Sequence, residues 1–415
     1  MNKTAYLFNH YFSDASLFQQ NDGRQLLLII KQKAMETRRD FLVTAGKGAI
    51  LMGMGSVIPQ FAQGSESYTE QPHTEYSGKT RRSQASLDQL PKFGMGGVTV
   101  GNEFEVVTDE QAHETLVAAW NAGVRYFDVA PWYGLGLAER RFGSFLHNQK
   151  REDFYLSTKV GKLLKASKKN RGAEIFPHAG SPNSPVFDYS ASGVRRSIED
   201  SLQRLGVDSI DIAFVHDLSP DFKFFDKSWL EYWEIAKKGA FPELNKMRDE
   251  GIIKAWGLGV NRPEPILKAL NDTTPDVFLM AAQYSLIDHK NALHNVFPEV
   301  RKRNIKLVMG SSLNAGFISG SNRYNYDPNK PIPPEFMTKR ETLRNIAAAH
   351  KVDLRTAALQ FSSFPDVAAS LIVGVRTAQQ ITEDAESMKV NIPADFWAEL
   401  KSKGLIENEA PTSKK

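Results

Sequence analysis

From Pro91 onward, short apolar runs alternate with longer segments whose apolar residues recur at helical spacing. Apolar runs of about four to eight residues are typical of buried strands, and the longer segments are typical of amphipathic helices. The predicted strands end at Gly96 and Gly97, Asp128, Lys159 and His216, and four more span 255–260, 278–284, 306–311 and 370–375. The predicted helices span 108–121, 137–147, 194–205, 229–248, 263–270, 291–303, 340–350 and 377–388, with an additional one at 354–361.

This alternation predicts the fold class. Eight strand–helix units in about 325 residues match a closed parallel barrel better than an open sheet, which seldom contains so many regular units. We therefore predict an α/β fold of the (β/α)8, or TIM-barrel, type over 91–400, followed by a C-terminal tail over 401–415. In such barrels the chemistry collects at the carboxyl ends of the strands, so polar residues that close an apolar strand become site candidates.

Three neighbouring predicted strands end in ionisable side chains, namely Asp128, Lys159 and His216. Tyr133 follows Asp128 within five residues, in a turn around a proline and a glycine. Each of the four also has a structural interpretation: a helix-capping acid, a half-buried loop aromatic, a surface lysine and a packed histidine. We favour a reactive site because the ends of adjacent barrel strands bring all four side chains to one rim.

A phenol, an ammonium, a carboxylate and an imidazole suit proton transfer. A close cation such as Lys159 stabilises a phenolate, so we expect a lowered pKa for Tyr133. Asp128 would keep Lys159 charged and oriented, and a neutral His216 would donate to a carbonyl oxygen or to the alkoxide that develops from it. No nucleophilic Ser or Cys and no metal-ligand spacing accompany the group. Proton transfer without a covalent partner points to hydride exchange with an organic cofactor.

Seven short motifs, taken in order, resemble those of the aldo-keto reductases. They are Phe-Asp-Val-Ala-Pro-Trp-Tyr-Gly at 127–134, Ser-Thr-Lys-Val-Gly at 157–161, Val-His-Asp at 215–217, Gly-Leu-Gly-Val-Asn at 257–261, Gln283, Asn-Ala-Gly-Phe-Ile-Ser-Gly at 314–320 and Gly-Val-Arg-Thr-Ala-Gln-Gln at 374–380. The order is specific, although each motif alone is weak. The resemblance implies that Asp128, Tyr133, Lys159 and His216 form a catalytic tetrad in which Tyr133 gives or takes the proton.

The same resemblance implies a nicotinamide cofactor and no metal. Asn261 and Gln283 would hold the nicotinamide carboxamide, and Arg376 could pair with a 2'-phosphate or be a surface arginine. The further implied cofactor residues are Gly316, Gly374, Gln380 and Asp384. Val260 stands where the family often has Ser or Thr. Asp384 stands where it often has Asn, and its charge disfavours a phosphate, so NADP and NAD both remain open.

Within the family, the runs at 131–143, 187–190 and 200–206 resemble the aldose 1-dehydrogenases that act on threo-aldoses or fucose, a branch that also holds a pyridoxal dehydrogenase. This resemblance implies a sugar or aldehyde substrate and oxidation of a cyclic hemiacetal to a lactone. The aromatic-rich loop at 217–233 would cover the substrate, or would pack. The alternatives are a reductase of non-sugar aldehydes or ketones and a catalytically silent nucleotide-binding accessory protein.

Charge and cysteine content narrow the function classes. The chain has a net charge of +4, but residues 1–64 contain seven basic and four acidic side chains, and the rest contains 45 and 44. This nearly neutral body argues against a nucleic-acid partner. The chain has no cysteine, which excludes disulfides, thiolate catalysis and cysteine-ligated metals.

The first 64 residues form a predicted leader. Arg38 and Arg39 precede an acid, a Phe, a Leu and a mild apolar stretch that runs to Ala62. This pattern resembles a twin-arginine export signal, which implies the twin-arginine export machinery as a partner and a periplasmic location. The alternative is an accidental arginine pair ahead of a small amphipathic helix, in a cytoplasmic protein.

The apolar stretch of the leader is too short, and too interrupted by Lys47, to span a membrane, which needs about twenty apolar residues. Translation could begin at Met1 or at Met35, and the sequence permits both. Residues 65–90 are polar, with few aliphatic side chains. We predict a linker without structure there.

Overall fold

The computed structural model describes residues 87–168, 171–326 and 331–413 of the 415-residue chain. The leader, its twin-arginine motif and both candidate start positions lie outside these residues and stay predictions. Among the described residues, no helix is both long enough and apolar enough to cross a membrane.

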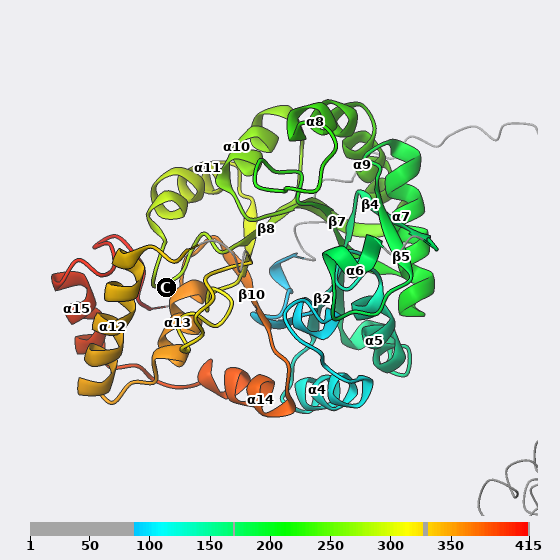
Figure 1. The fold of residues 1–415 in the computed structure, drawn as a ribbon. Helices are drawn as coiled ribbons and strands as arrows, with labels where there is room; N and C mark the ends of the chain where they lie inside the picture. The colour runs from blue at the N-terminus through cyan, green and yellow to red at the C-terminus, as the bar shows by residue number, and fades with distance from the viewer. Residues whose placement is uncertain (1–86, 169–170, 327–330, 414–415) are drawn as a thin grey trace, which may run out of the picture. The chain divides into compact units, whose positions relative to one another are not determined.

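Eight parallel strands close into a barrel, in the order β1-β10-β9-β8-β7-β6-β3-β2 around the ring (Figure 1). Their bounds are β1 Phe93–Gly96, β2 Tyr126–Asp128, β3 Tyr155–Val160, β6 Ile210–His216, β7 Ile253–Val260, β8 Val277–Ala281, β9 Lys306–Gly310 and β10 Ala368–Gly374. This closed ring confirms the predicted (β/α)8 fold.

Helices surround the barrel (Figure 1). They are α4 Asp109–Asn121, α5 Leu137–Leu146, α7 Ala191–Leu205, α8 Trp229–Lys238, α9 Ala240–Glu250, α10 Pro263–Asp272, α11 Phe297–Lys302, α12 Pro334–Ala349, α13 Leu354–Ser363, α14 Ala378–Ser387 and α15 Ala394–Ser402. Side-chain caps fix several starts: Thr108 accepts a hydrogen bond from Gln111 N before α4, and Thr377 accepts one from Gln380 N before α14.

Two predicted helices differ from the observed ones. The helix predicted over 229–248 breaks at Gly239, where φ is −123° and ψ is −73°. A Cβ there would lie 2.8 Å from Ala191 N, so the close approach of the two segments requires glycine. The helix predicted over 291–303 starts with the π-helical turn Ala292–Val296. Pro298, at the start of α11, lacks the N–H that would continue the α-helical pattern.

The sequence pattern did not predict a small antiparallel hairpin outside the barrel, formed by β4 Lys162–Ala166 and β5 Asn183–Phe187. The short helix α6 Arg171–Ile175 lies between its strands. Gly161 turns the chain from β3 into β4 with a φ of +96°, and a Cβ there would lie 2.2 Å from the Tyr189 ring. Because of this turn, Lys162 lies just beyond the carboxyl end of β3.

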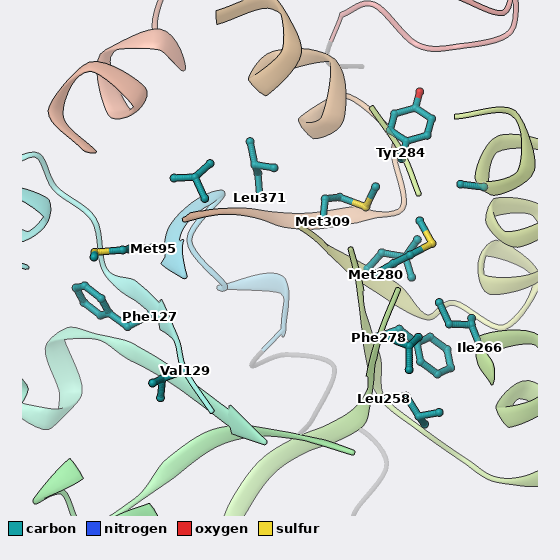
Figure 2. Close-up of a cluster of buried hydrophobic side chains, with 14 of the residues drawn as sticks. Met95, Phe127, Val129, Leu258, Ile266, Phe278, Met280, Tyr284, Met309 and Leu371 are labelled. Carbon is teal, nitrogen blue, oxygen red and sulfur yellow. The ribbon is translucent and has the colours of Figure 1, made fainter. Parts of the chain in front are cut away.

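Two apolar layers hold the fold together. One fills the barrel, with Tyr126, Phe214 and Leu279 among its members. The other packs the outer face of the strands against the helices, as Figure 2 shows for Phe278 of β8 and Ile266 of α10. Along a strand, successive side chains alternate between the two layers.

Both ends of the folded body extend beyond the boundaries that the sequence suggested. Leu87 and Leu90, which we assigned to the linker, are buried in the cluster inside the barrel. Ile406 and Ala410, which we assigned to the C-terminal tail, are buried in the outer cluster. These apolar side chains are few and do not recur at strand or helix spacing, so the local pattern gives no sign of their burial.

Candidate active site

The four ionisable residues that the sequence singled out meet at the carboxyl ends of β2, β3 and β6, which are neighbours in the barrel. Lys159 Nζ donates to Asp128 Oδ2 at 2.7 Å and to the carbonyl oxygen of Val129 at 3.1 Å. The same ammonium lies 4.6 Å from the centre of the Tyr133 ring. The rings of Tyr133 and His216 meet edge to face, with centres 5.6 Å apart.

The ion pair at the base of this group is buried, with exposed fractions of 1% for Lys159 and 2% for Asp128. The other oxygen of Asp128 accepts a hydrogen bond from Ser157 Oγ at 2.6 Å. Ser157 Oγ is in turn 3.0 Å from the hydroxyl of Tyr126. This network gives both oxygens of the buried carboxylate a donor, which a buried charge needs.

The structure corrects the expected pKa shift of Tyr133. Burial and the negative charge of Asp128 raise the pKa of the half-buried phenol well above its usual value. The Lys159 ammonium is paired with Asp128 and lies over the Tyr133 ring. Tyr133 is therefore a neutral phenol that can donate a proton.

His216 has the neutral imidazole that we expected. Burial and the nearby ammonium groups of Lys162 and Lys159 hold its pKa well below the usual value. Its Nε2 atom is 3.4 Å from Asp217 Oδ2, and its buried Nδ1 atom has no hydrogen-bond partner in the described part of the chain. A carboxylate oxygen can only accept, so this arrangement favours the tautomer with the proton on Nε2.

The aromatic residues of the predicted covering loop divide into two groups. Phe222 and Phe224 lie against Trp132, with ring centres 5.2 Å and 5.4 Å apart. Trp233 of α8 is fully buried and donates to Asp272 at 2.8 Å, so it belongs to the core. Only the first group lies beside the loop that contains Tyr133.

The residues predicted to hold a cofactor lie on the other half of the barrel rim, after β7, β8, β9 and β10. Asn261 and Gln283 are adjacent, since Gln283 Nε2 donates to the Asn261 carbonyl oxygen at 2.6 Å. Gly316 follows β9 with a φ of +86°, which favours glycine, and Gly374 ends β10. Gln380 of α14 accepts from Arg376 N at 2.9 Å and so fixes the turn before that helix.

These residues fit a dinucleotide. Among the described residues, nothing hydrogen-bonds to the side-chain amide of Asn261 or to Gln283 Oε1, so both can bind a carboxamide. The N-terminus of α14 and the guanidinium of Arg376 together suit an anionic group such as a phosphate.

Carboxylates surround the two guanidinium groups near α14. Arg376 forms an ion pair with Glu105 from the loop after β1. Arg355 lies 2.7 Å from Glu383 and 3.3 Å from Asp384. Asp384 is buried, and this burial raises its pKa to about 6. In this structure the Asp384 carboxylate is therefore held beneath the surface by Arg355.

The sequence analysis missed a second charged cluster beside the four residues. Lys162 Nζ is 2.6 Å from Asp217 Oδ2, and half-buried Glu103 lies near both. Lys162 directly follows the matched motif at 157–161, three residues after Lys159, and Asp217 is the last residue of the matched motif at 215–217, one residue after His216. Because both residues lie so close to a strand end, the sequence could have identified them as site candidates.

A comparison with known proteins agrees with this geometry. The model of the aldo/keto reductase family matches residues 92–404. The chain belongs to this family. Aldo/keto reductases are NAD(P)-dependent oxidoreductases, and the protein is an enzyme of that kind.

The aldo/keto reductase has curated relatives over most of its length. It is 34% identical to a D-threo-aldose 1-dehydrogenase from a Pseudomonas species, over 76% of this chain and 95% of the relative. It is also 34% identical to pyridoxal 4-dehydrogenase from Microbacterium luteolum, over 80% of this chain and 99% of the relative.

Solved structures support the fold. An aldo-keto reductase from Bacillus halodurans in its holo form and a glycerol dehydrogenase from Gluconobacter oxydans each give a TM-score of 0.56. They are 19% and 17% identical to this chain, and in both cases the match covers 79% of it and 94% of the solved chain. At this identity they bear on the fold alone.

Proposed function

We propose that the enzyme oxidises the cyclic hemiacetal of an aldose to a lactone and transfers the hydride to NAD. The observation that carries this proposal is the buried Lys159–Asp128 pair beneath the Tyr133 ring, with the neutral imidazole of His216 beside it. The identity to D-threo-aldose 1-dehydrogenase supports the substrate class.

In the proposed reaction the anomeric C–H bond breaks, and its electron pair leaves as hydride while the hydroxyl proton goes to Tyr133 Oη in its deprotonated, phenolate form, which becomes the neutral phenol. When bound, the oxidised nicotinamide supplies the hydride acceptor. His216 donates from Nε2 to the anomeric oxygen and orients it. Lys159 contacts the Tyr133 ring and Asp128 holds Lys159, so together they keep the phenol in place. They also keep one positive and one negative charge at fixed positions beside it. In the reverse direction the Tyr133 hydroxyl protonates the carbonyl oxygen.

Charge near α14 supports NAD rather than NADP. Two guanidinium groups there, of Arg376 and Arg355, have four carboxylate neighbours. A 2'-phosphate would add two negative charges to a region that is already net negative. Asn261 and Gln283 are the proposed carboxamide ligands, and Gly316, Gly374 and the start of α14 are the proposed neighbours of the rest of the dinucleotide.

Non-sugar carbonyl compounds are the second candidate substrate class, favoured by the identity to pyridoxal 4-dehydrogenase. Assays of the purified enzyme with threo-aldoses and with pyridoxal, each with NAD and NADP, separate the two classes. The proposal requires NAD-dependent conversion of an aldose to its lactone, identified by mass. Turnover of pyridoxal alone would replace it with the second class.

We also propose that the enzyme is exported with its cofactor already bound, because the twin-arginine route carries folded proteins. The support is the Arg38–Arg39 motif and the apolar stretch behind it. Replacing both arginines with lysine should retain the protein in the cytoplasm. Fractionation that finds the wild-type protein only in the cytoplasm would exclude export.

A further inference from the structure

A second buried ion pair lies directly beside the four residues. Lys162 Nζ is 2.6 Å from Asp217 Oδ2, and the exposed fractions of the two side chains are 1% and 15%. The same Oδ2 atom is 3.4 Å from His216 Nε2, the nitrogen that would donate to the anomeric oxygen. A molecule that binds to His216 therefore lies within reach of Asp217.

The Lys162 ammonium has hydrogen-bonding capacity to spare. In the described part of the chain, Asp217 Oδ2 is the one oxygen to which it donates, although an ammonium has three donors. Its other close neighbours are aromatic rings, with centres 4.3 Å away at Trp132 and 3.8 Å away at Phe222. The ammonium therefore has donors that no oxygen of the described residues accepts.

Glu103 adds a third charged group. It comes from the loop after β1, is half-buried, and makes no hydrogen bond or ion pair with another described residue. Burial and the charge of Asp217 raise its pKa to about 7. Both Glu103 and Asp217 also act on the pKa of Tyr133, so both lie near the phenol.

Stability alone does not explain this arrangement. A buried ion pair stabilises a fold no better than apolar side chains of similar volume, because both charges lose their water. Asp217 also has a φ of +46°, held by a hydrogen bond from its N–H to the Gly259 carbonyl at 2.9 Å. Such a left-handed conformation is uncommon outside glycine and tends to occur at functional sites.

We propose that Lys162 and Asp217, with Glu103, form a subsite that binds the ring hydroxyls of the aldose beside its anomeric carbon; this rests on the proposed function. Carboxylates accept hydrogen bonds from adjacent hydroxyls, and the ammonium donates to the hydroxyl oxygens. The three charged side chains are thus suited to a substrate ring with several hydroxyl groups. A substrate ring without hydroxyls would leave them without hydrogen-bond partners.

The test compares two substrates that share the hemiacetal and differ in the ring hydroxyls. One is a threo-aldose, and the other is 2-hydroxytetrahydropyran, which has no hydroxyl except the anomeric one. The variants are Lys162→Met and Glu103→Gln. The matched control is Lys254→Met, because Lys254 Nζ is likewise 2.6 Å from an aspartate, Asp211, and lies 5.4 Å from the Tyr155 ring, at the amino end of β7.

Loss of a hydrogen bond to a charged group should lower kcat/KM for the aldose by about 10- to 100-fold in both variants, mainly through KM. The value for 2-hydroxytetrahydropyran should change by less than about threefold in Glu103→Gln. In Lys162→Met, which also removes a charge beside His216, it should fall by less than the value for the aldose, and Lys254→Met should leave both values near wild type. Equal losses for the two substrates, or no loss for either, would overturn the subsite and leave the proposed function standing.

A wild-type enzyme that oxidises 2-hydroxytetrahydropyran and no aldose would overturn the proposed substrate class, and the subsite with it. Circular dichroism of each variant shows whether it is folded. If Lys162→Met is unfolded, Glu103→Gln decides the question alone, because Glu103 makes no hydrogen bond or close ion pair with another described residue and Gln keeps its shape.

Discussion

Lys159 donates to the carboxylate of Asp128 at 2.7 Å and faces the ring of Tyr133, with 4.6 Å between its Nζ atom and the ring centre. Burial and the negative charge of Asp128 raise the pKa of the phenol and leave it protonated, which is the opposite of the pKa shift that the sequence suggested. The arrangement of Lys159, Asp128 and Tyr133 therefore leads to two predictions, one for the stability of the protein and one for the pH dependence of turnover.

Replacing Lys159 with methionine should lower the free energy of unfolding by about 3–5 kcal/mol, because it leaves the Asp128 carboxylate buried without a cation. Urea denaturation followed by circular dichroism measures this loss. Lys254→Met, in which the paired lysine is exposed, should cost less than about 1 kcal/mol. A Lys159 variant as stable as the Lys254 variant would show that the buried pair is not strongly coupled.

The pH dependence of turnover should differ between the two directions. Burial and Asp128 raise the pKa of Tyr133, so the phenol is neutral throughout the range below pH 10 and kcat for reduction should stay flat from pH 6 to about 9. Oxidation needs the phenolate, whose fraction increases about tenfold per pH unit below the pKa, so kcat for oxidation should rise without a plateau. A plateau near pH 7 would mean a lowered pKa for Tyr133.

Binding of the aldose should weaken above about pH 8. Burial and the nearby charge of Lys159 lower the pKa of Lys162 to about 8. The charges of Asp217 and Glu103 act in the opposite direction. As pH rises through this value the ammonium loses its proton and its charge, so KM for the aldose should increase. Lys162→Arg keeps its charge and should remove the increase. An unchanged pH profile of KM in that variant would contradict this assignment.

Cofactor binding should favour NADH over NADPH, and the preference should depend on Glu105 and Asp384. Glu105→Gln combined with Asp384→Asn removes two negative charges beside Arg376 and Arg355 and should tighten NADPH binding by about tenfold, measured by calorimetry. Glu386→Gln, on the same helix, is the control because Glu386 pairs with Lys389 instead. Tighter binding of NADPH than of NADH to the wild-type enzyme would refute the preference.

The sequence predicted the barrel because its strands are nearly continuous apolar runs separated by clear helical segments, and it predicted Asp128, Lys159 and His216 because each closes such a run. The hairpin of β4 and β5 was missed because Lys162, Lys165 and Pro185 interrupt its apolar pattern. The break at Gly239 was missed because it arises from contact with a segment nearly fifty residues away, near Ala191.

The charged cluster and the pKa of Tyr133 could not be predicted for a related reason. Glu103 and Asp217 come from two loops and Lys162 from the start of β4. Lys162 and Asp217 follow Lys159 and His216 closely, but no pattern within one segment indicates that these two residues meet Glu103. The sign of the Tyr133 shift depends on how deeply the phenol is buried and on how close it lies to Asp128. That is a property of the three-dimensional arrangement.

The most direct test of the central claim is Tyr133→Phe, which removes the hydroxyl and keeps the ring that faces Lys159 and His216. We expect a loss of kcat of about 10²- to 10⁴-fold in both directions, with the dissociation constant for NADH within about twofold of wild type. A variant that turns over aldoses at the wild-type rate would contradict the assignment of Tyr133 as the group that transfers the proton.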